Sequence, residues 1–243
     1  MTINLGGAPI KDVRVAGVQA QRVMLGTGTS AVEVWSAKPP VSPAAFGAVH
    51  WLPFTPEPTT DLGTQPRTWE TYGTVNVADG ALTSGRVRYP DNSAYTPIAG
   101  CAMTYWVKHT SSLNSLGANA FEARADYSEM RQNIHGATRA VRWRFGRGGT
   151  SAQSLDAGTV PLGVWTFIAA CMEPVSGTTW RYRGYINGNQ VVNNTYNAGV
   201  QHPVTWVELQ VNPQDGHVDD AAVYNRALTA EEITALYEIG RTT

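Results

Sequence analysis

The stretch VDDAAVYNRALTAEEI, residues 218–233, ends in a clear helix start. Thr229 and Glu232 have the spacing of a capping box, in which the Thr hydroxyl accepts from a first-turn amide and the Glu carboxylate reaches back. Ile233, Leu236 and Tyr237 then recur at helical spacing, and Gly240 ends the pattern. A helix with one apolar face must dock on something, most simply the domain that it follows.

The rest of the chain is patterned for strands. Its 243 residues include 24 Gly, 14 Pro, 8 Trp and 10 Tyr, a composition rich in strand and turn formers. Short apolar runs bounded by Gly, Asn or Pro recur, and helical periodicity is missing before the C-terminal helix. The sequence therefore predicts an all-β fold, a two-sheet antiparallel jelly-roll sandwich with a short C-terminal helix.

Two segments predict particular strands. Trp180–Val192 alternates on either side of Asn187-Gly188, which supplies the two positive-φ positions of a type I′ turn, so a hairpin is expected. Trp165–Met172 is apolar almost throughout, which suits a strand covered on both faces.

Proline marks a change in organisation. Half of the prolines lie between Pro39 and Pro66, where they cannot form the interior of a sheet. We therefore divide the chain into a small β-rich N-terminal module at residues 1–38, a Pro-rich linker at 39–47 and the jelly roll at 48–243. Residues 1–38 can bury little surface, so the module is expected to need a partner.

The charge balance excludes several classes of partner. Eighteen basic and 19 acidic side chains give a net charge of -1, so no bulk field draws the chain to nucleic acid or anionic lipid. No stretch approaches the length of a membrane span, and the N-terminus lacks the pattern of a signal peptide, so neither is expected. Cys101 and Cys171 are too few for a multi-bridge scaffold, and two buried thiols are the favoured interpretation.

Four segments carry a resemblance to a family. Residues 218–233 are similar to the closing strand and helix of laminin G-like, concanavalin A-like jelly-roll domains, in which I-D-D-V-x-I-Y-N-R-A-L precedes S/T-x-E-E-I. Three upstream segments resemble the family's I-S-A-W-V-K and G-x-W-x-x-V-A strands and its Y-V-N-G-x-x-V hairpin, in family order: MTYWVK at 103–108, GVWTFIA at 163–169 and YINGNQV at 185–191. The resemblance spans about residues 48–240 and implies the same jelly roll.

The N-terminal segment, from Ile3 to Trp35, resembles a different family. The pattern I-N-L-G-G-x-P-I-x-x-V-x-V from Ile3 onward, ending in Val34-Trp35 and a proline linker, is similar to the N-terminal segment of minor tail proteins from phages of actinobacteria. Such proteins attach through a small N-terminal module and present a binding domain outward. The resemblance implies other tail proteins as partners of residues 1–38, a homo-oligomer with a trimer favoured, and a place in the virion tail after assembly in the host cytoplasm.

Catalytic patterns are weak. Glycoside hydrolases need two carboxylates across the scissile bond, and the nearest candidates are Glu122, Asp126 and Glu129. Their spacing does not match the E-x-D-x-x-E or E-x-D-x-E motif of glucanases with this fold, so a solvated loop is favoured and no catalytic residue is assigned. The histidines show neither H-x-x-x-H nor H-E-x-x-H spacing: His50, His109, His135, His202 and His217.

Calcium is the one cofactor considered. Many laminin G-like domains hold one ion, and the resemblance implies Asp219 as the matching ligand, with Asp61 in the opening loop as a partner. A hard cation wants several oxygens, and the sequence offers only these scattered ones. The alternative is a plain hydrogen-bonding role for Asp219 at a strand end.

Two strands alternate arginine with apolar residues. Arg142 and Arg144 share one face of their strand, and Arg181, Arg183 and Tyr185 share a face of another. If both strands lie in one sheet, these residues form a single basic strip that contacts a cell-surface glycan through bidentate arginines and a stacking ring. A subunit interface and a solvated face are the alternatives.

Together these features predict a non-enzymatic minor tail protein that presents a laminin G-like domain for binding a host-surface glycan or protein. The alternative is a bacterial carbohydrate-binding module, or a glycan-active enzyme, of the concanavalin A-like fold. Fold alone does not decide between them.

Overall fold

The computed structural model describes residues 43–54, 57, 59–78, 80–89, 100–110, 119–124, 129–134, 138–146, 153–197, 206–211 and 216–240, with six short strands between residues 4 and 36. For those six strands, β11, Glu129, Gly146 and Trp206 it describes the backbone alone. The chain divides into two compact units, residues 1–41 with 242–243 and residues 42–241. The division falls inside the expected linker.

The first unit contains three two-stranded antiparallel pairings, which join β1 to β2, β3 to β4 and β5 to β6. The strands are β1 (Asn4–Leu5), β2 (Ala8–Pro9), β3 (Arg14–Val15), β4 (Val18–Gln19), β5 (Arg22–Leu25) and β6 (Val32–Ser36).

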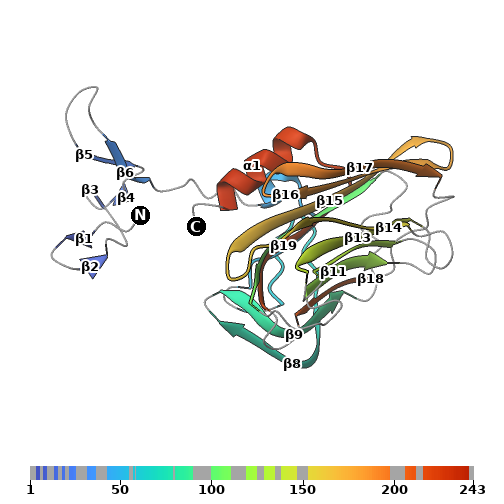
Figure 1. Ribbon diagram of the computed structural model, residues 1–243. Helices are drawn as coiled ribbons and strands as arrows, with labels where there is room; N and C mark the ends of the chain where they lie inside the picture. Colours follow the sequence, from blue (N-terminus) through green and yellow to red (C-terminus); the bar gives the residue numbers. More distant parts are fainter. Residues whose placement is uncertain are drawn as a thin grey trace. The chain divides into compact units, whose positions relative to one another are not determined.

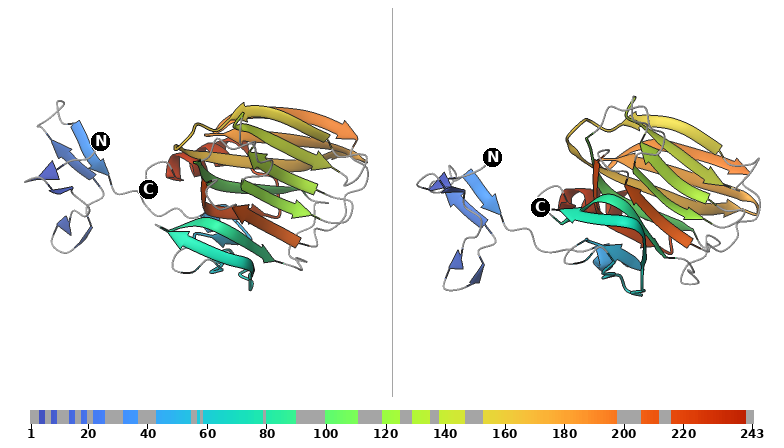
Figure 2. Two further views of the ribbon diagram at one scale, coloured as in Figure 1. Left: turned by 60° about the horizontal axis from the view of Figure 1, so that its bottom comes forward. Right: turned by 90° about the horizontal axis from the view of Figure 1, so that it is seen from below.

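The second unit is a sandwich of antiparallel strands in two layers (Figures 1 and 2). The layer that we call the front sheet runs in the order β14 (Gln153–Thr159), β13 (Ala140–Gly146), β12 (Glu129–Ile134), β11 (Asn119–Arg124), β18 (Trp206–Val211), β9 (Ala81–Tyr89), β8 (Glu70–Ala78). The back sheet runs in the order β7 (His50–Leu52), β19 (Gly216–Tyr224), β10 (Cys101–His109), β15 (Trp165–Ser176), β16 (Thr179–Ile186), β17 (Asn189–Asn197). One pairing, Val218 with Leu82, joins the layers where β19 meets β9.

The main core fills the space between the layers. Phe145 of β13 and Tyr182 of β16 stack with their ring centroids 4.8 Å apart. Next to them a Cβ on Gly184 of β16 would lie 2.9 Å from the Trp143 ring of β13, so a larger residue there would push the layers apart. These contacts place β13 and β16 face to face. The all-β jelly-roll prediction is confirmed.

A second core lies on the outer side of the back sheet, under the helix α1 (Ala230–Gly240). Ile233 and Leu236 of the helix are buried, and Tyr237 stacks on Trp106 of β10 with ring centroids 5.9 Å apart. The short 3₁₀ helix η2 (Pro43–Phe46) contributes Phe46 to the same cluster. The helix therefore docks on the sandwich, as its apolar face predicted.

The local sequence signals behave as predicted. Asn187 and Gly188 have φ of 50° and 77° between β16 and β17, as the type I′ hairpin requires. The Glu232 amide donates to the Thr229 hydroxyl at 3.2 Å, and the Thr229 amide donates to the Glu232 carboxylate at 2.8 Å. Residues 166–172 of β15 are buried, because one core covers each face of this strand.

Cys101 and Cys171 are free and wholly buried. They lie on neighbouring strands, but Cys101 points into the main core and Cys171 into the second core, so the sheet separates the two thiols. Burial raises the pKa of both, that of Cys171 to about 11. Among the described residues, no helix is long and apolar enough to cross a membrane.

Candidate functional site

Three strands at one end of the front sheet carry a polar grid on their outer face. Side chains alternate along a strand, and the inward residues of β12 and β13 are buried in the main core. The outward residues are Arg131 and Asn133 on β12 and Arg142 and Arg144 on β13. The register places Arg131 opposite Arg144, Asn133 opposite Arg142, and Ser154 of β14 opposite Arg144. The grid therefore follows from strand pairing.

A hollow of about 210 Å³ lies over this grid, and we call it the arginine hollow. Among the described residues its lining includes three guanidinium groups, and the lining residues are Arg131, Asn133, Arg142, Arg144 and Ser154.

Arg142 forms an ion pair at the edge of the hollow. Arg142 donates through Nε and Nη2 to both oxygens of Asp156 on β14, at 2.8 and 2.9 Å. The hydrogen bonds to Asp156 raise the pKa of Arg142. Arg131 lies opposite Arg144 in the register of β12 and β13. Glu122 of β11 is the register neighbour of Arg131 on the far side from Arg144.

The other end of the same face is balanced in charge. Arg86 of β9 forms an ion pair with Glu208 of β18, with 3.3 Å between Nε and Oε1. Arg88 lies 5.8 Å from the centre of the Tyr72 ring, and the Tyr72 hydroxyl donates to Glu70 at 2.7 Å. Two basic and two acidic residues therefore offset each other at this end of the sheet.

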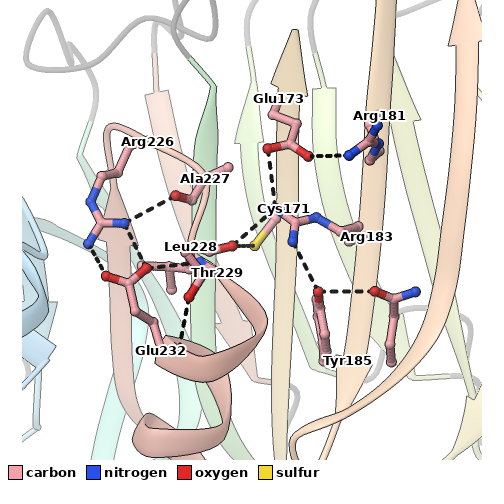
Figure 3. A network of polar contacts seen from close by, with 11 residues as sticks. Cys171, Glu173, Arg181, Arg183, Tyr185, Arg226, Ala227, Leu228, Thr229 and Glu232 are labelled. Atoms are coloured by element: carbon pink, nitrogen blue, oxygen red, sulfur yellow. Dashed lines mark hydrogen bonds and ion pairs between the residues drawn. The ribbon is translucent and has the colours of Figure 1, made fainter. Parts of the chain in front are cut away.

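The outer face of the back sheet carries a different polar network (Figure 3). Arg183 of β16 donates to the Leu228 carbonyl at 3.1 Å and to Glu173 of β15 at 3.3 Å. Its other terminal nitrogen donates to the Tyr185 hydroxyl at 3.3 Å. Arg183 thereby ties the sheet to the segment just before α1. Arg181 forms a long contact of 3.4 Å with the same Glu173 and is more exposed.

The same network anchors the start of the helix (Figure 3). Arg226 binds both oxygens of Glu232, at 2.6 and 2.8 Å, and donates to the Phe46 carbonyl at 2.9 Å. The Arg226 guanidinium lowers the pKa of Glu232. These ion pairs and hydrogen bonds hold α1 and η2 on the back sheet, which is a structural role.

The single basic strip predicted from the sequence is wrong. Arg142 and Arg144 point out of the front sheet, whereas Arg181 and Arg183 point out of the back sheet, because β13 and β16 face each other across the core. Tyr185 is only 1% exposed beneath the second core, so its ring is unavailable for stacking on a ligand. The structure brings together Arg142 and Arg144 and leaves the other three residues elsewhere.

The predicted calcium ligands do not fit a calcium ion. Burial alone would raise the pKa of Asp61, but its hydrogen bonds, first that with His50, lower it. Five nitrogens lie within hydrogen-bond distance of its two carboxylate oxygens: His50 Nδ1, the amides of Trp51, Gly63 and Arg67, and Trp69 Nε1, at 2.7 to 3.1 Å. A carboxylate occupied by N–H donors has no lone pair directed at a cation.

Asp219 has fewer hydrogen-bond donors around it than Asp61. Its Oδ1 accepts from the amide of Asp220 at 2.7 Å, and Asp220 has a φ of 47° within β19. Burial, followed by the Asp220 charge, raises the pKa of Asp219 to about 7. Asp219 thus forms a local hydrogen bond in the middle of β19, whereas the alternative to calcium had placed it at a strand end. In the described part of the chain, no three His, Cys, Asp or Glu side chains cluster as metal ligands.

Other residues considered for catalysis or metal binding are either buried in the core or lie outside the described residues. His50 and His109 are buried, at 1% and 0% exposure. Asp126, His135 and His202 lie outside the described residues, as do the side chains of Glu122 and Glu129.

Sequence reasoning missed three residues of the arginine hollow. Arg131 and Asn133 alternate with buried Met130, Gln132 and Ile134, but the polar Gln132 hides the period of two. Ser154 lies in a strand of mostly exposed residues. The alternation in Met-Arg-Gln-Asn-Ile was therefore the available signal. An interpretation that allows a buried Gln would have placed Arg131 and Asn133 on the outer face of one strand.

Two antiparallel sheets packed face to face with a helix on the outer side define a β-sandwich of the jelly-roll class. Residues 79–234 match the concanavalin A-like lectin/glucanases superfamily, and the chain belongs to that superfamily. No curated protein matches the sequence.

Solved structures with this fold include several binding domains. The receptor-binding domain of botulinum neurotoxin C/D mosaic serotype has a TM-score of 0.65 at 14% identity, over 79% of this chain and 51% of that one. Domain 4 of AbnA, a GH43 extracellular arabinanase from Geobacillus stearothermophilus, in complex with arabinotriose, has a TM-score of 0.61 at 20% identity, over 78% and 98%. The serotype D ligand-binding domain of botulinum neurotoxin, in complex with N-acetylneuraminic acid, has a TM-score of 0.61 at 12% identity, over 79% and 50%.

This chain therefore spans about half the length of the neurotoxin domains and nearly all of the arabinanase domain. At these identities the likeness establishes the fold.

Proposed function

We propose that this protein is a phage minor tail protein whose concanavalin A-like domain binds a glycan on the host cell surface. The observation that carries the proposal is the outer face of the front sheet. At the β12–β13–β14 end this face carries arginine, asparagine and serine side chains, which the strand register places next to one another. Arginine, asparagine and serine side chains supply the planar and hydroxyl groups that sugar hydroxyls and acidic groups require.

The N-terminal unit supports the tail assignment. Residues 1–41 form a separate compact unit of short hairpins, and their sequence resembles the N-terminal segment of minor tail proteins. In this proposal the unit attaches to other tail proteins, the chain assembles as a trimer in the host cytoplasm, and the sandwich is presented on the virion.

The fold supports the glycan assignment. Domain 4 of AbnA was solved with arabinotriose, and a neurotoxin domain of the same fold was solved with N-acetylneuraminic acid. A shallow sheet surface buries little ligand, so each contact is weak and the copies in an oligomer multiply it.

The test is sedimentation of the labelled full chain with actinobacterial envelope fractions that are untreated, oxidised with periodate or treated with protease. Periodate cleaves vicinal diols of sugars, so a glycan receptor predicts co-sedimentation that periodate abolishes and protease spares. Binding that protease abolishes and periodate spares would show a protein receptor instead. Flanking genes that encode no tail proteins would overturn the tail assignment.

A second candidate is the sugar-binding module of a bacterial glycan-active enzyme. The structural match favours it, because 78% of this chain covers 98% of the arabinanase domain, which is a whole module. A catalytic domain encoded in the same or an adjacent gene distinguishes this function from the tail protein.

A further inference from the structure

We propose that Trp165 of β15 is the platform of a second sugar-binding site, on the outer face of the back sheet, where a sugar ring stacks on the indole. This site is separate from the face of the front sheet that carries the proposed function. The inference rests on the proposed function for its ligand class, the sugar units of a surface glycan.

The first argument is the exposure of the indole ring. Among the tryptophans whose side chains the structure describes, Trp165 is the most exposed, at 38%. Leu162 and Val164, in the turn that leads into β15, are 46% and 52% exposed. Single apolar residues on a surface are ordinary, whereas adjacent ones mark a site that binds a ligand or a partner.

The turn that presents these residues is held in place. Gly163 has a φ of 72°, a left-handed conformation that glycine adopts without strain. Its amide donates to the carbonyl of His109, the last residue of β10, at 2.7 Å. The Thr166 hydroxyl donates to the Val164 carbonyl at 3.2 Å. The platform is therefore ordered before a ligand arrives, which lowers the entropy cost of binding.

The second argument is the row of side chains that the register places beside the ring. Lys108 of β10 is the partner of Trp165 on one side and of His217 of β19 on the other. Trp106 and Phe167, each two residues away along the same strands, belong to the second core. Because side chains two residues apart share a face, the row lies on the outer face of the back sheet.

The two rings of this row meet above β10. Strands β15 and β19 lie on either side of β10, so their backbones are roughly 9 to 10 Å apart. The ring centroids of Trp165 and His217 are only 6.3 Å apart, with 62° between the ring planes. The rings therefore lean toward each other over Lys108, and this contact orients the indole.

This combination of groups suits a sugar. A sugar ring has a face of C–H groups, which packs on an aromatic ring, and a rim of hydroxyls. Beside the indole, the Lys108 ammonium donates hydrogen bonds, and a neutral His217 imidazole donates through one nitrogen and accepts through the other. The row thus offers an apolar surface and polar groups at the same level.

A sugar fits this surface better than a second protein chain. A specific protein interface uses roughly 20 to 30 residues on each side. In the described part of the chain, the other exposed large hydrophobic side chains lie in other segments, at Leu62, Tyr72, Val175 and Val191. The apolar surface at Trp165 is therefore limited to one turn and one strand end, which suits a ligand of a few sugar rings.

The experiment is isothermal titration of the full chain with arabinotriose, the ligand in the structure of the arabinanase domain. We expect Trp165→Ala to weaken binding about tenfold or more, because it removes the stacking surface. Trp165→Phe keeps an aromatic face and should lose less than about threefold. Lys108→Met keeps the apolar stem but removes the donors, and should lose about fivefold.

The matched control is Leu62→Ala, which truncates an exposed apolar side chain elsewhere and should change the affinity less than about twofold. Circular dichroism and melting verify that all variants are folded. Equal affinities of the wild type, Trp165→Ala and Lys108→Met, or an equal loss in Leu62→Ala, would overturn the site.

A second measurement reports on the ring itself. N-bromosuccinimide oxidises exposed indoles, and peptide mass spectrometry locates the oxidised residue. A sugar stacked on Trp165 should protect this ring from oxidation, because the bound ligand covers it. Oxidation of Trp165 at the same rate with and without bound arabinotriose would overturn the stacking.

The envelope assay separates this inference from the proposed function. Periodate-sensitive binding to envelopes that is the same in wild type and Trp165→Ala would overturn this inference and leave the proposed function standing. A wild-type chain that binds arabinotriose through Trp165 but binds no envelope would do the opposite. A chain that binds neither would overturn both.

Discussion

At the scale of single residues, buried carboxylates have clear structural functions. Asp61 accepts hydrogen bonds from the segment before β8 and from β7, and it holds the buried His50. The Asp61 side chain is only 1% exposed and accepts several hydrogen bonds. Its replacement should lower the free energy of unfolding strongly, because each donor would lose its partner.

We therefore predict that Asp61→Asn lowers the free energy of unfolding by about 3 kcal/mol, since an amide nitrogen would face N–H donors that now meet an oxygen. Urea denaturation at neutral pH measures the loss. The control is Asp156→Asn, whose pairing with Arg142 is solvent-exposed and whose loss should cost less than about 1 kcal/mol. Similar losses in both variants would contradict the anchoring role of Asp61.

Asp219 gives a prediction about pH. Its pKa is raised from 3.8 to about 7 by burial and by Asp220, so the folded chain keeps a proton that the unfolded chain has released. Stability should therefore fall as pH rises from about 4 to about 7 and level off above that range. Asp219→Asn removes this dependence, so its stability relative to wild type should increase between about pH 5 and about pH 8.

Chemical denaturation at about pH 5 and at about pH 8 measures the difference in stability between wild type and Asp219→Asn. Glu231→Gln is the control, because the backbone amide of Glu231 lowers the pKa of this exposed carboxylate and it does not titrate in the same range. A parallel pH profile for wild type and Asp219→Asn would disprove the account of Asp219.

At the scale of elements, α1 is held by apolar packing and by an ionic anchor. Ile233 and Leu236 pack on the back sheet, while Arg226 and Glu232 fix the start of the helix. Arg183 connects the sheet to the Leu228 carbonyl just before the helix. Arg183, which the sequence suggested as a ligand-binding residue, therefore helps to attach the helix to the back sheet.

Leu236→Ala should destabilise the sandwich by about 2 to 4 kcal/mol, because it leaves a cavity under the helix. Glu231 lies on the exposed side of α1, so Glu231→Ala should leave stability almost unchanged. Thermal or urea unfolding measures both. Equal effects would mean that the helix does not contribute its apolar face to the fold.

At the scale of the whole molecule, the chain consists of a small and a large unit. The large unit has two cores, which lie on the two sides of the back sheet. The described strands of the small unit form three short antiparallel pairs, and strand pairs of this size bury too little surface to offset their ordering entropy.

Residues 42–243 expressed alone should therefore give a folded, soluble domain with a cooperative thermal transition, and residues 1–38 should not. The truncation begins before η2, because the Phe46 carbonyl accepts from Arg226 and belongs to the sandwich. Circular dichroism and size exclusion are the measurements. A soluble 1–38 monomer that melts cooperatively would contradict the expected need for a partner.

The sequence by itself determined what depends on neighbouring residues. The Asn187-Gly188 turn, the Thr229–Glu232 capping box, the face of α1 and the doubly covered β15 are all local consequences of residue type and spacing. The closing motif identified the jelly roll for the same reason, since it encodes a strand, a turn and a helix in succession.

Only the tertiary structure decided which strands lie together. Alternation placed Arg142 and Arg181 correctly on the outer faces of their strands, but it could not tell that these faces belong to opposite layers. Alternation also could not predict that Arg131 lies opposite Arg144, because strand order and register are set by long-range packing of the two sheets. The candidate site is a property of register, and register is fixed only when the core between the sheets has formed.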